Sequence, residues 1–466
     1  MRTRNGRTPS TGKVRRDITG GKRGQGNKRT RAIRRPELNR VRIGKPDPCL
    51  TAVGGLVGFG VYLRAQGVDR DLRRMFGELK SRSAAIYPME AQLRLLVDLF
   101  VTGEARVFGI ESRAADPLFA FIAGGTLPSL DTVYRDLERF DDASIAQLDR
   151  YAAEHGLAPV RSRRLSTVHV DIDTTVEPLF GTHEGALPGP NPSYHGRPSY
   201  HPVLARVAET DTVVGAQLRP GNTAFGNAET VFVERIMGRV RDAVGADCIM
   251  HVRIDGAGDC TEIMQVIDKG GAFYVTKGKM TADLCSAIAR TTRWKTIDRD
   301  AMDKPTRQVA EIEFARGEWL KAGLPVRVIA IRSRDRDSGK QIHLWEHLNY
   351  SVQVFLTNDV HSSAEDIARR YDLRAGIEPL IGELKAAWGI GKVPSRSFDA
   401  NHAALLLKIL SHNLLRRYVS AEAPALRRWR APWIRRALIL IPGRLGHRGR
   451  TRTLRMAPRP ILTKRE

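Results

Sequence analysis

The stretch Tyr-Asp-Leu-Arg-Ala-Gly-Ile-Glu-Pro-Leu-Ile-Gly-Glu-Leu-Lys, residues 371–385, combines two side-chain patterns at helical spacing. At about 100° per residue, four polar residues fall within roughly a 60° arc of one helix face. They are Tyr371, Arg374, Glu378 and Lys385. A separate apolar stripe consists of Leu373, Ile377, Leu380, Ile381 and Leu384. Because this stripe would fix the helix against a core, the sequence predicts that Glu378 points into a site beside two cations.

The start of this helix is predicted at Ser362, which forms a capping box with Glu365, and Asp366 adds negative charge to the first turn. Pro379 lacks an N–H and should clash with the carbonyl four residues earlier, so we expect a kink next to Glu378. The alternative to a functional site is a solvated polar face with ordinary ion pairs, because such stripes are common on surface helices.

A first strand is predicted from Thr167 to Asp173, where apolar and polar residues alternate and the run ends in the turn-prone sequence Asp-Thr-Thr. Asp171 and Asp173 therefore project from the same face of this strand. For Asp173, and for Asp255 in the second strand described next, a helix cap or a turn former is the competing interpretation when either is taken alone.

A second strand is predicted from Cys248 to Ile254, ending at Asp255 and followed by Gly256, Gly258 and a helix over about 259–269. In open α/β sheets, ligands bind at the carboxyl ends of strands. An acidic residue in this position is therefore a better candidate for a site than one in a loop.

These three segments, in this order and spacing, resemble the DDE transposases of bacterial insertion sequences that carry a Tyr-Arg-Glu-Lys signature. More narrowly, three stretches resemble transposase DDE domain group 1: Gly-Arg-Pro-Ser-Tyr-His-Pro (196–202), Arg-Ile-Asp-Gly-Ala (253–257) and Tyr-Asp-Leu-Arg-Ala-Gly-Ile-Glu (371–378). The resemblance covers about residues 48–450. It implies an α/β fold with a ribonuclease-H-like mixed sheet flanked by helices. It also implies a β-rich insertion between the second and third acids.

The same resemblance implies that Asp173, Asp255 and Glu378 are the catalytic acids. Cleavage of a DNA phosphodiester requires an activated nucleophile and a neutralised leaving oxygen, which two Mg²⁺ ions about 3.5 to 4 Å apart supply together. Such hard cations take oxygen ligands. We therefore expect these three carboxylates to hold two Mg²⁺ ions, which Mn²⁺ is able to replace. Asp171 is the rival first ligand, but the Asp-Thr-Thr context favours Asp173.

By the resemblance, Tyr371, Arg374 and Lys385 are expected to contact DNA near the scissile phosphate. A guanidinium can fork onto phosphate oxygens, an ammonium acts as a point charge, and a phenol can donate a hydrogen bond or stack. Their expected role is to position the substrate.

The charge distribution independently favours a nucleic-acid partner. Residues 1–46 hold sixteen Lys and Arg against two acids, and residues 421–466 hold thirteen against two, so the two ends carry the whole formal charge of +25. Cationic arms suit double-stranded DNA, because each neutralised phosphate releases counterions. A solubilising or RNA-attracting role for the tails is the alternative. Almost no apolar residues occur in 1–46, so disorder without a partner is expected there.

The length of the chain predicts several structural units. We expect a basic tail (1–46), a helical DNA-binding domain (47–160), the first part of the core (161–283), the β-rich insertion (284–361), the second part of the core (362–420) and a basic C-terminal tail (421–466). Two helices between Pro117 and Phe140 could form a helix-turn-helix with Arg135 and Arg139 outward, or simply belong to a bundle.

Within the core, the predicted order is three strands, a helix, the strand ending at Asp255, a second helix and a last strand. This order is that of a ribonuclease-H-like fold and brings the first and fourth strands together. In the insertion, Trp294, Trp319 and Trp345 could stack on a displaced DNA base, although core packing is the more common role of such residues.

Other residues give weaker indications. Four cysteines without a Cys-x-x-Cys pair indicate neither a zinc ribbon nor a redox motif. His183, His195 and His201 with Glu184 fit no standard zinc spacing and are expected at the surface or facing DNA. The most apolar helix, about 401–418, contains Lys408 and so favours a core helix packed on the sheet over a membrane span. We expect a cytoplasmic, nucleoid-associated bacterial protein.

Three functions follow from these patterns. The first is a transposase, acting as a homodimer, that cleaves at terminal inverted repeats and joins the new 3′-hydroxyl to target DNA. The second is an inactive DNA-binding relative that acts as a repressor. The third is a structure-specific nuclease on the same fold. The intact acidic set favours the first.

Overall fold

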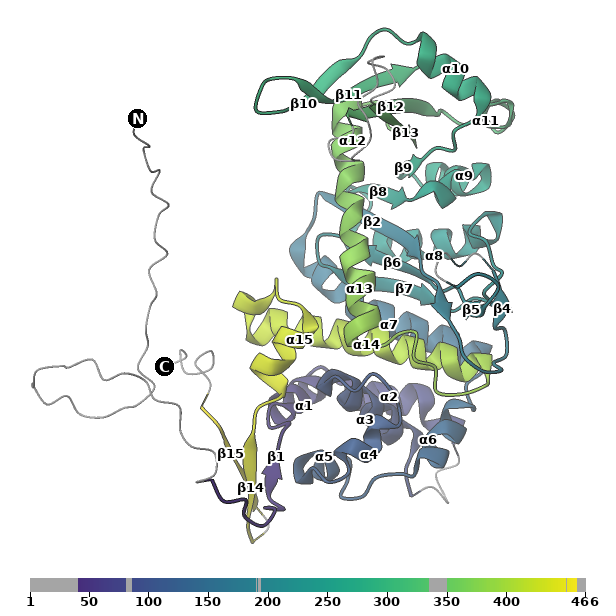
Figure 1. Ribbon diagram of the computed structural model, residues 1–466. Coiled ribbons are helices and arrows are strands. Elements are labelled where there is room, and N and C mark those ends of the chain that lie inside the picture. The colour runs from purple at the N-terminus through teal and green to yellow at the C-terminus, as the bar shows by residue number, and fades with distance from the viewer. Residues whose placement is uncertain are drawn as a thin grey trace, which may run out of the picture. The chain divides into compact units, whose positions relative to one another are not determined.

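A computed structural model describes residues 41–80, 86–189, 191, 194–334, 350–449 and 451–458 of the chain. The chain divides into two units, Met1–Asp47 and Pro48–Glu466, and the elements below belong to the second unit (Figure 1). Most of the basic segment 1–46 lies outside the described residues, as do Trp345 and the end of the basic segment 421–466.

A nine-stranded mixed sheet forms the centre of the second unit (Figure 1). Across the sheet the order is β10 (Lys295–Arg299), β11 (Pro305–Ile312), β12 (Arg327–Arg334), β13 (Tyr350–Thr357), β9 (Phe273–Lys277), β8 (Ile249–Ile254), β2 (Thr167–Thr174), β6 (Val203–Val207) and β7 (Thr212–Gln217). Strands β2, β8 and β9 are parallel, and the other neighbours are antiparallel. The predicted first and fourth core strands, β2 and β8, are therefore adjacent.

Helices cover both faces of the sheet. On one face, α8 (Thr230–Val244), α9 (Thr261–Lys269) and the end of α7 (Asp142–Arg163) bury alternate strand residues such as Val170 and Ile172. On the other face, α12 (Ala364–Asp372) packs on β9 and the inserted strands. A large mixed sheet between helices is consistent with the ribonuclease-H-like transposase fold that the resemblance implied.

The inserted segment is β-rich, as predicted, and contains β10 to β13 with α11 (Gly317–Lys321), following α10 (Ala282–Arg290). Its strands continue the core sheet, because β13 pairs antiparallel with β9 and places Phe355 opposite Lys277. This pairing occupies the backbone edge that β9 would otherwise expose. Trp319 is 1% exposed, which confirms the core-packing interpretation for this residue. Trp294 is partly buried beneath the guanidinium of Arg332.

Helices precede the sheet, as predicted: α1 (Leu56–Ala65), α2 (Val68–Phe76), α3 (Met89–Thr102), α4 (Gly109–Arg113), α5 (Pro117–Ile122), α6 (Leu130–Leu137) and α7. Side chains of Asp116 and Ser129 cap α5 and α6, which explains where these two helices begin. Both helices bury residues in one core shared with the C-terminal helices. The arrangement fits a bundle, and the reading of DNA by α6 stays a prediction.

The apolar helix expected at 401–418 is α14 (Phe398–Glu422), which is a core helix. It packs mainly between α7 and α3 and contacts the sheet at its edge strand β7. There the Asn413 side chain accepts from the backbone N–H of Val213 (3.1 Å) and donates to its carbonyl (2.7 Å). No described helix is long and apolar enough to cross a membrane.

The C-terminal segment differs from the expected basic tail, because residues 424–458 are folded in their described part. They form α15 (Ala431–Ile434) and the hairpin β14 (Gly443–Arg448) and β15 (Thr451–Met456), which pairs with β1 (Leu50–Thr51). Arg435 is 4% exposed and donates to the carbonyls of Phe100, Val101 and Ala387, at the ends of α3 and α13 (Ile377–Ala387). The guanidinium of Arg435 thus binds free carbonyls at the C-terminal ends of two helices, so this arginine stabilises the fold.

The predicted helix over 362–385 is interrupted. Helix α12 is followed by a 3-10 turn, η7 (Leu373–Gly376), and then by α13. The kink expected from Pro379 thus takes the form of a tighter turn directly before α13. The altered winding turns Leu373 away from the core, leaving it 66% exposed, whereas Ile377 and Leu384 are buried as predicted.

The helix also begins one residue later than predicted. Ser363, not Ser362, accepts from the backbone N–H of Asp366 (3.2 Å). Ser362 is engaged elsewhere, since its carbonyl accepts from Arg327 (2.9 Å) and its hydroxyl from Arg370 (3.1 Å).

Candidate active site

The sheet brings the first two predicted acids together. Strands β2 and β8 are parallel, with Ile172 opposite Ile254. Asp173 is the next residue of β2, and Asp255 follows β8 directly. Since paired strands lie about 4.8 Å apart, the two aspartates are neighbours at the carboxyl ends of these strands.

Local hydrogen bonds hold both aspartates. Asp173 Oδ1 accepts from the backbone N–H of Thr174 (2.9 Å). Asp255 Oδ1 accepts from the N–H of Ala257 (2.9 Å) and so caps the 3-10 turn Gly256–Gly258. The capping role considered for Asp255 is therefore realised, together with its place beside Asp173.

Arg374 links the third predicted acid, Glu378, to Asp173. Arg374 Nη2 lies 2.8 Å from Asp173 Oδ2, and its Nη1 lies 3.7 Å from Glu378 Oε1. The Arg374 side chain is 9% exposed, whereas that of Glu378 is 67% exposed. One buried guanidinium thus joins the first and third acids, and Glu378 faces solvent.

The electrostatics join all three acids. Burial raises the pKa of Asp173 to about 6, against the opposing effect of Arg374, and the charges of Asp255 and Glu378 raise it further. Burial likewise raises the pKa of Tyr371 to about 12, and the same three acids contribute to this shift. The three carboxylates therefore form one cluster beside a tyrosine.

Asp171, the rival first ligand, is placed differently. Its carboxylate is 0% exposed and accepts from Arg253 Nε (2.6 Å) and Arg206 Nε (2.9 Å). Both carboxylate oxygens of Asp171 accept hydrogen bonds. The 3-10 turn η7 covers this part of the sheet, because a Cβ added to Gly376 would lie only 2.5 Å from the guanidinium of Arg206. Asp171 is thus enclosed within the fold, and Asp173 is the one that lies with Asp255 and Glu378.

The other two signature residues lie around the acids with partners of their own. The Tyr371 ring packs on Phe355 with centroids 4.2 Å apart. Lys385 Nζ donates to the carbonyl of Val176 (2.9 Å) and lies 3.2 Å from Glu177 Oε1. Lys385 therefore ties α13 to the chain that follows Asp173 by a few residues.

Residues 40–463 match the family model of transposase DDE domain group 1, which spans nearly the whole chain. The chain belongs to this family. DDE transposases generally use divalent metal ions, and the DDE domain implies transposase catalysis. No curated protein matches the chain. Among solved structures, the cryo-EM structure of the piggyBac transposase synaptic complex with hairpin DNA is similar, with a TM-score of 0.42 and 12% identity, covering 82% of this chain and 79% of that chain.

In this DDE transposase domain, one histidine beside the acids has a role that sequence reasoning missed. His201 is 8% exposed, although it was expected at the surface or facing DNA. Its Nδ1 donates to the carbonyl of Thr223 (2.8 Å), so its Nε2 accepts from the hydroxyl of Thr174 (3.1 Å), next to Asp173. The contact follows from the antiparallel pairing of β2 with β6, which places Thr174 opposite Val203 and so brings His201 to the end of β2.

The neighbouring His and Glu residues do not gather around a metal. His183 Nδ1 contacts the carbonyl of Ser395 (2.9 Å), Glu184 accepts from the backbone N–H of Phe398 (3.0 Å), and His195 is exposed.

The three acids of the DDE domain fit divalent cations by their chemistry. They supply only oxygen ligands, the donors that Mg²⁺ and Mn²⁺ prefer. In the described part of the chain, no three His, Cys, Asp or Glu side chains already surround one metal-sized point. Arg374 instead supplies the positive charge between Asp173 and Glu378. Its Nε has no hydrogen-bond partner among the described residues, which leaves a buried donor free for a ligand.

Proposed function

We propose that this protein is a DNA transposase that cleaves at the ends of an insertion sequence and transfers the 3′-hydroxyl into target DNA. The observation that carries the proposal is that Asp173 and Asp255 lie side by side at the carboxyl ends of β2 and β8, while Arg374 links Asp173 to Glu378 on α13. Three separate elements supply these acids, and the chain belongs to the DDE transposase family. Terminal inverted repeats and target DNA are the proposed substrates, and a homodimer is the proposed unit that pairs two ends.

Asp173, Asp255 and Glu378 would hold two Mg²⁺ ions, for which Mn²⁺ can substitute. When bound, these ions supply activation of the attacking oxygen and neutralisation of the leaving oxygen. The raised pKa of Asp173 supports this role, because it reflects first the burial of the carboxylate and then the charges of Asp255 and Glu378, a combination that a bound cation would offset.

Arg374 is proposed to hold the scissile phosphate. Its unpartnered Nε is a donor in a buried position, and a guanidinium can present two parallel donors to phosphate oxygens. Tyr371 would orient the same group through its phenol, which burial and the nearby acids keep protonated. Lys385 would add a point charge near the DNA backbone, with its ammonium anchored by Val176 and Glu177.

Action on chromosomal DNA places the proposed site of function in the bacterial cytoplasm at the nucleoid. The DNA flanking the coding region supplies the substrate for a test, because short inverted repeats there would be the cognate ends.

The test is cleavage and joining of labelled cognate ends by the purified protein with Mg²⁺. We expect D173N, D255N and E378Q each to lose at least about 100-fold in cleavage rate, because each removes a proposed ligand. The matched control is E234Q, an exposed glutamate on α8, which should cleave normally. Normal cleavage by the three acid variants would refute the proposal. Binding without cleavage by the wild type would indicate a repressor, and cutting of branched DNA without joining would indicate a nuclease.

A further inference from the structure

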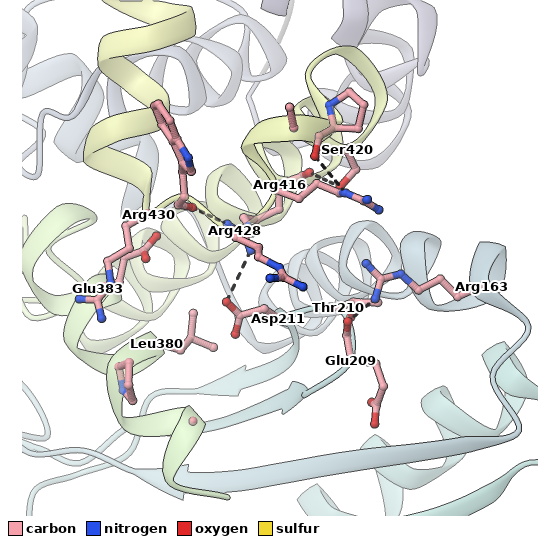
Figure 2. A pocket seen from close by; sticks show the side chains of 16 residues that line it. Arg163, Glu209, Thr210, Asp211, Leu380, Glu383, Arg416, Ser420, Arg428 and Arg430 are labelled. Atoms are coloured by element: carbon pink, nitrogen blue, oxygen red, sulfur yellow. Dashed lines mark hydrogen bonds and ion pairs between the residues drawn. The ribbon is translucent and has the colours of Figure 1, made fainter. Parts of the chain in front are cut away.

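A cavity of about 810 Å³ lies beside α13, on the helix that carries Glu378 (Figure 2). Its walls come from the end of α7, the turn between β6 and β7, the start of α13, the end of α14 and residues 424–430. Figure 2 shows Arg163 and Glu383 on opposite sides of this cavity with Asp211 between them. Its volume falls within the roughly 300–1,000 Å³ that is usual for ligand sites.

The charged residues that line the cavity are mostly arginines. The basic ones are Arg163, Arg416, Arg427, Arg428 and Arg430. The acidic ones are Glu209, Asp211 and Glu383. Which sign the cavity presents to a ligand depends on which of these charges already have partners.

Each of the three acids has a partner among the described residues, but the partners differ: arginines pair with Asp211, whereas a histidine binds Glu209 and a backbone N–H binds Glu383. Asp211 Oδ1 lies 2.9 Å from Arg206 Nη1 and its Oδ2 lies 3.5 Å from Arg416 Nη2. Glu209 contacts His169 Nδ1 (2.7 Å). Glu383 accepts from the backbone N–H of Ala431 (3.0 Å), and burial raises its pKa above the ordinary value.

Four of the arginines remain without a bound carboxylate among the described residues. Arg163 donates to the carbonyl of Glu209, and Arg427 to that of Pro424 (3.1 Å), and neither bond compensates the charge. The side chains of Arg428 and Arg430 are exposed and form no hydrogen bond or ion pair with the described part of the chain, although the charge of Arg430 acts on the nearby Glu383. The cavity therefore presents a surplus of positive charge and suits an anionic ligand.

An aromatic ring stands among these arginines. Trp429 lines the cavity with 39% of its surface exposed, and its backbone carbonyl accepts from Arg416 (2.9 Å). Trp433, one helical turn later, is 57% exposed. Exposed indoles between guanidinium groups are the combination that binds unpaired nucleotides, because bases stack on the ring while phosphates pair with the cations.

We infer that this cavity binds unpaired nucleotides of single-stranded DNA, with phosphates on Arg163, Arg427 and Arg428 and a base on Trp429. The arginines and Trp429 line the same hollow, so a single strand with unpaired bases can contact both kinds of group at once. A paired base cannot offer its face to an indole. The inference rests on the proposed function for the identity of the nucleic acid as DNA.

The position of the cavity gives this site a use in the proposed reaction. Gly376 and Pro379 line it, and both lie within two residues of Glu378. A strand that is unpaired next to the cut is thereby held beside the helix that supplies the third acid.

The test measures binding of the full-length protein in EDTA to a labelled 12-nucleotide oligo-dT and to a labelled duplex, so that cleavage plays no part. For R427A/R428A we expect at least a tenfold loss of affinity for the single strand and less than about a threefold loss for the duplex. The salt slope for the single strand should fall by about 1.4, or 0.7 for each lost phosphate contact. The control K269A/R290A removes the same charge from exposed positions outside the cavity and should leave the difference between the two DNAs unchanged.

Trp429 tests the stacking part of the site. W429A should lose about 5- to 150-fold in single-strand affinity, the range for one stacked base, and W429F should recover most of it. If R427A/R428A unfolds at a lower temperature than the wild type, R163A at the end of α7 provides the same comparison of single-stranded and duplex DNA. Equal losses for both DNAs, or no loss for the single strand, would overturn the inference. EDTA prevents cleavage, so the binding test does not depend on catalysis. A failure of the proposed function would appear in the cleavage assay, and a failure of this inference would appear in the binding assay.

Discussion

Asp171 and Asp173 lie two residues apart on the same face of β2, yet their surroundings differ completely. Asp171 is 0% exposed, and the guanidinium groups of Arg206 and Arg253 bind both of its oxygens. The Asp173 side chain is 13% exposed and pairs with a single guanidinium, that of Arg374. Asp171, whose charge is fully paired, stabilises the fold, whereas Asp173, whose charge is only partly paired, suits the proposed chemistry.

The largest effect should come from breaking the saturated cluster. D171A leaves Arg206 and Arg253 buried without their shared carboxylate, so we expect the free energy of unfolding to fall by about 3–5 kcal/mol. D173A, the matched variant on the same strand, should lose no stability at neutral pH. Urea unfolding followed by circular dichroism measures both, and equal losses would contradict the comparison.

The second effect concerns pH. The folded pKa of Asp173 is about 6 against an ordinary 3.8, so the fold favours the protonated acid. The stability that Asp173 contributes is therefore fully present below pH about 4 and is lost as the pH rises through about 6, a change of about 3 kcal/mol at 1.36 kcal/mol per pKa unit. Urea unfolding between pH 4 and 7 should show this slope in the wild type. D173N should be flatter by that amount, and a variant with an unchanged slope would place the shift elsewhere.

The smallest effect should come from removing the one cation that Asp173 has. R374Q takes away the charge that lowers the pKa of Asp173, so the pH-dependent step in stability should move to higher pH. The same unfolding series measures it. D173N/R374Q serves as the control, since the step should vanish in the double variant. A step that stays at pH about 6 would mean that Arg374 does not lower the pKa of Asp173.

Local patterns in the sequence predicted the elements that carry the three acids. Alternation over Thr167–Asp173 located β2, and the strand before Asp255 located β8. The spacing of Ile377 to Leu384 located the buried face of α13. These predictions succeeded because each depends on residues close together in the chain.

What the sequence did not reveal depends on contacts between distant residues. Arg435 was counted as part of a basic tail, but it caps helices that end more than 300 positions earlier and 48 positions earlier. His201 lies beside Thr174 because β2 and β6 pair antiparallel, which places Thr174 opposite Val203. The pairing of Arg374 with Asp173 likewise joins residues about 200 positions apart, and no periodicity records it.

The sheet that runs without a break from β7 to β10 also sets what can be cut out of this protein. Helix α12 lies on Ile329, Ile331 and Phe355 of the inserted strands. Replacing residues 284–361 by a short loop would remove the inserted strands on which α12 packs. Glu378, which follows the deleted segment closely in sequence, would then lose its position relative to the two aspartates, so removal of the insertion should disturb the proposed catalytic site.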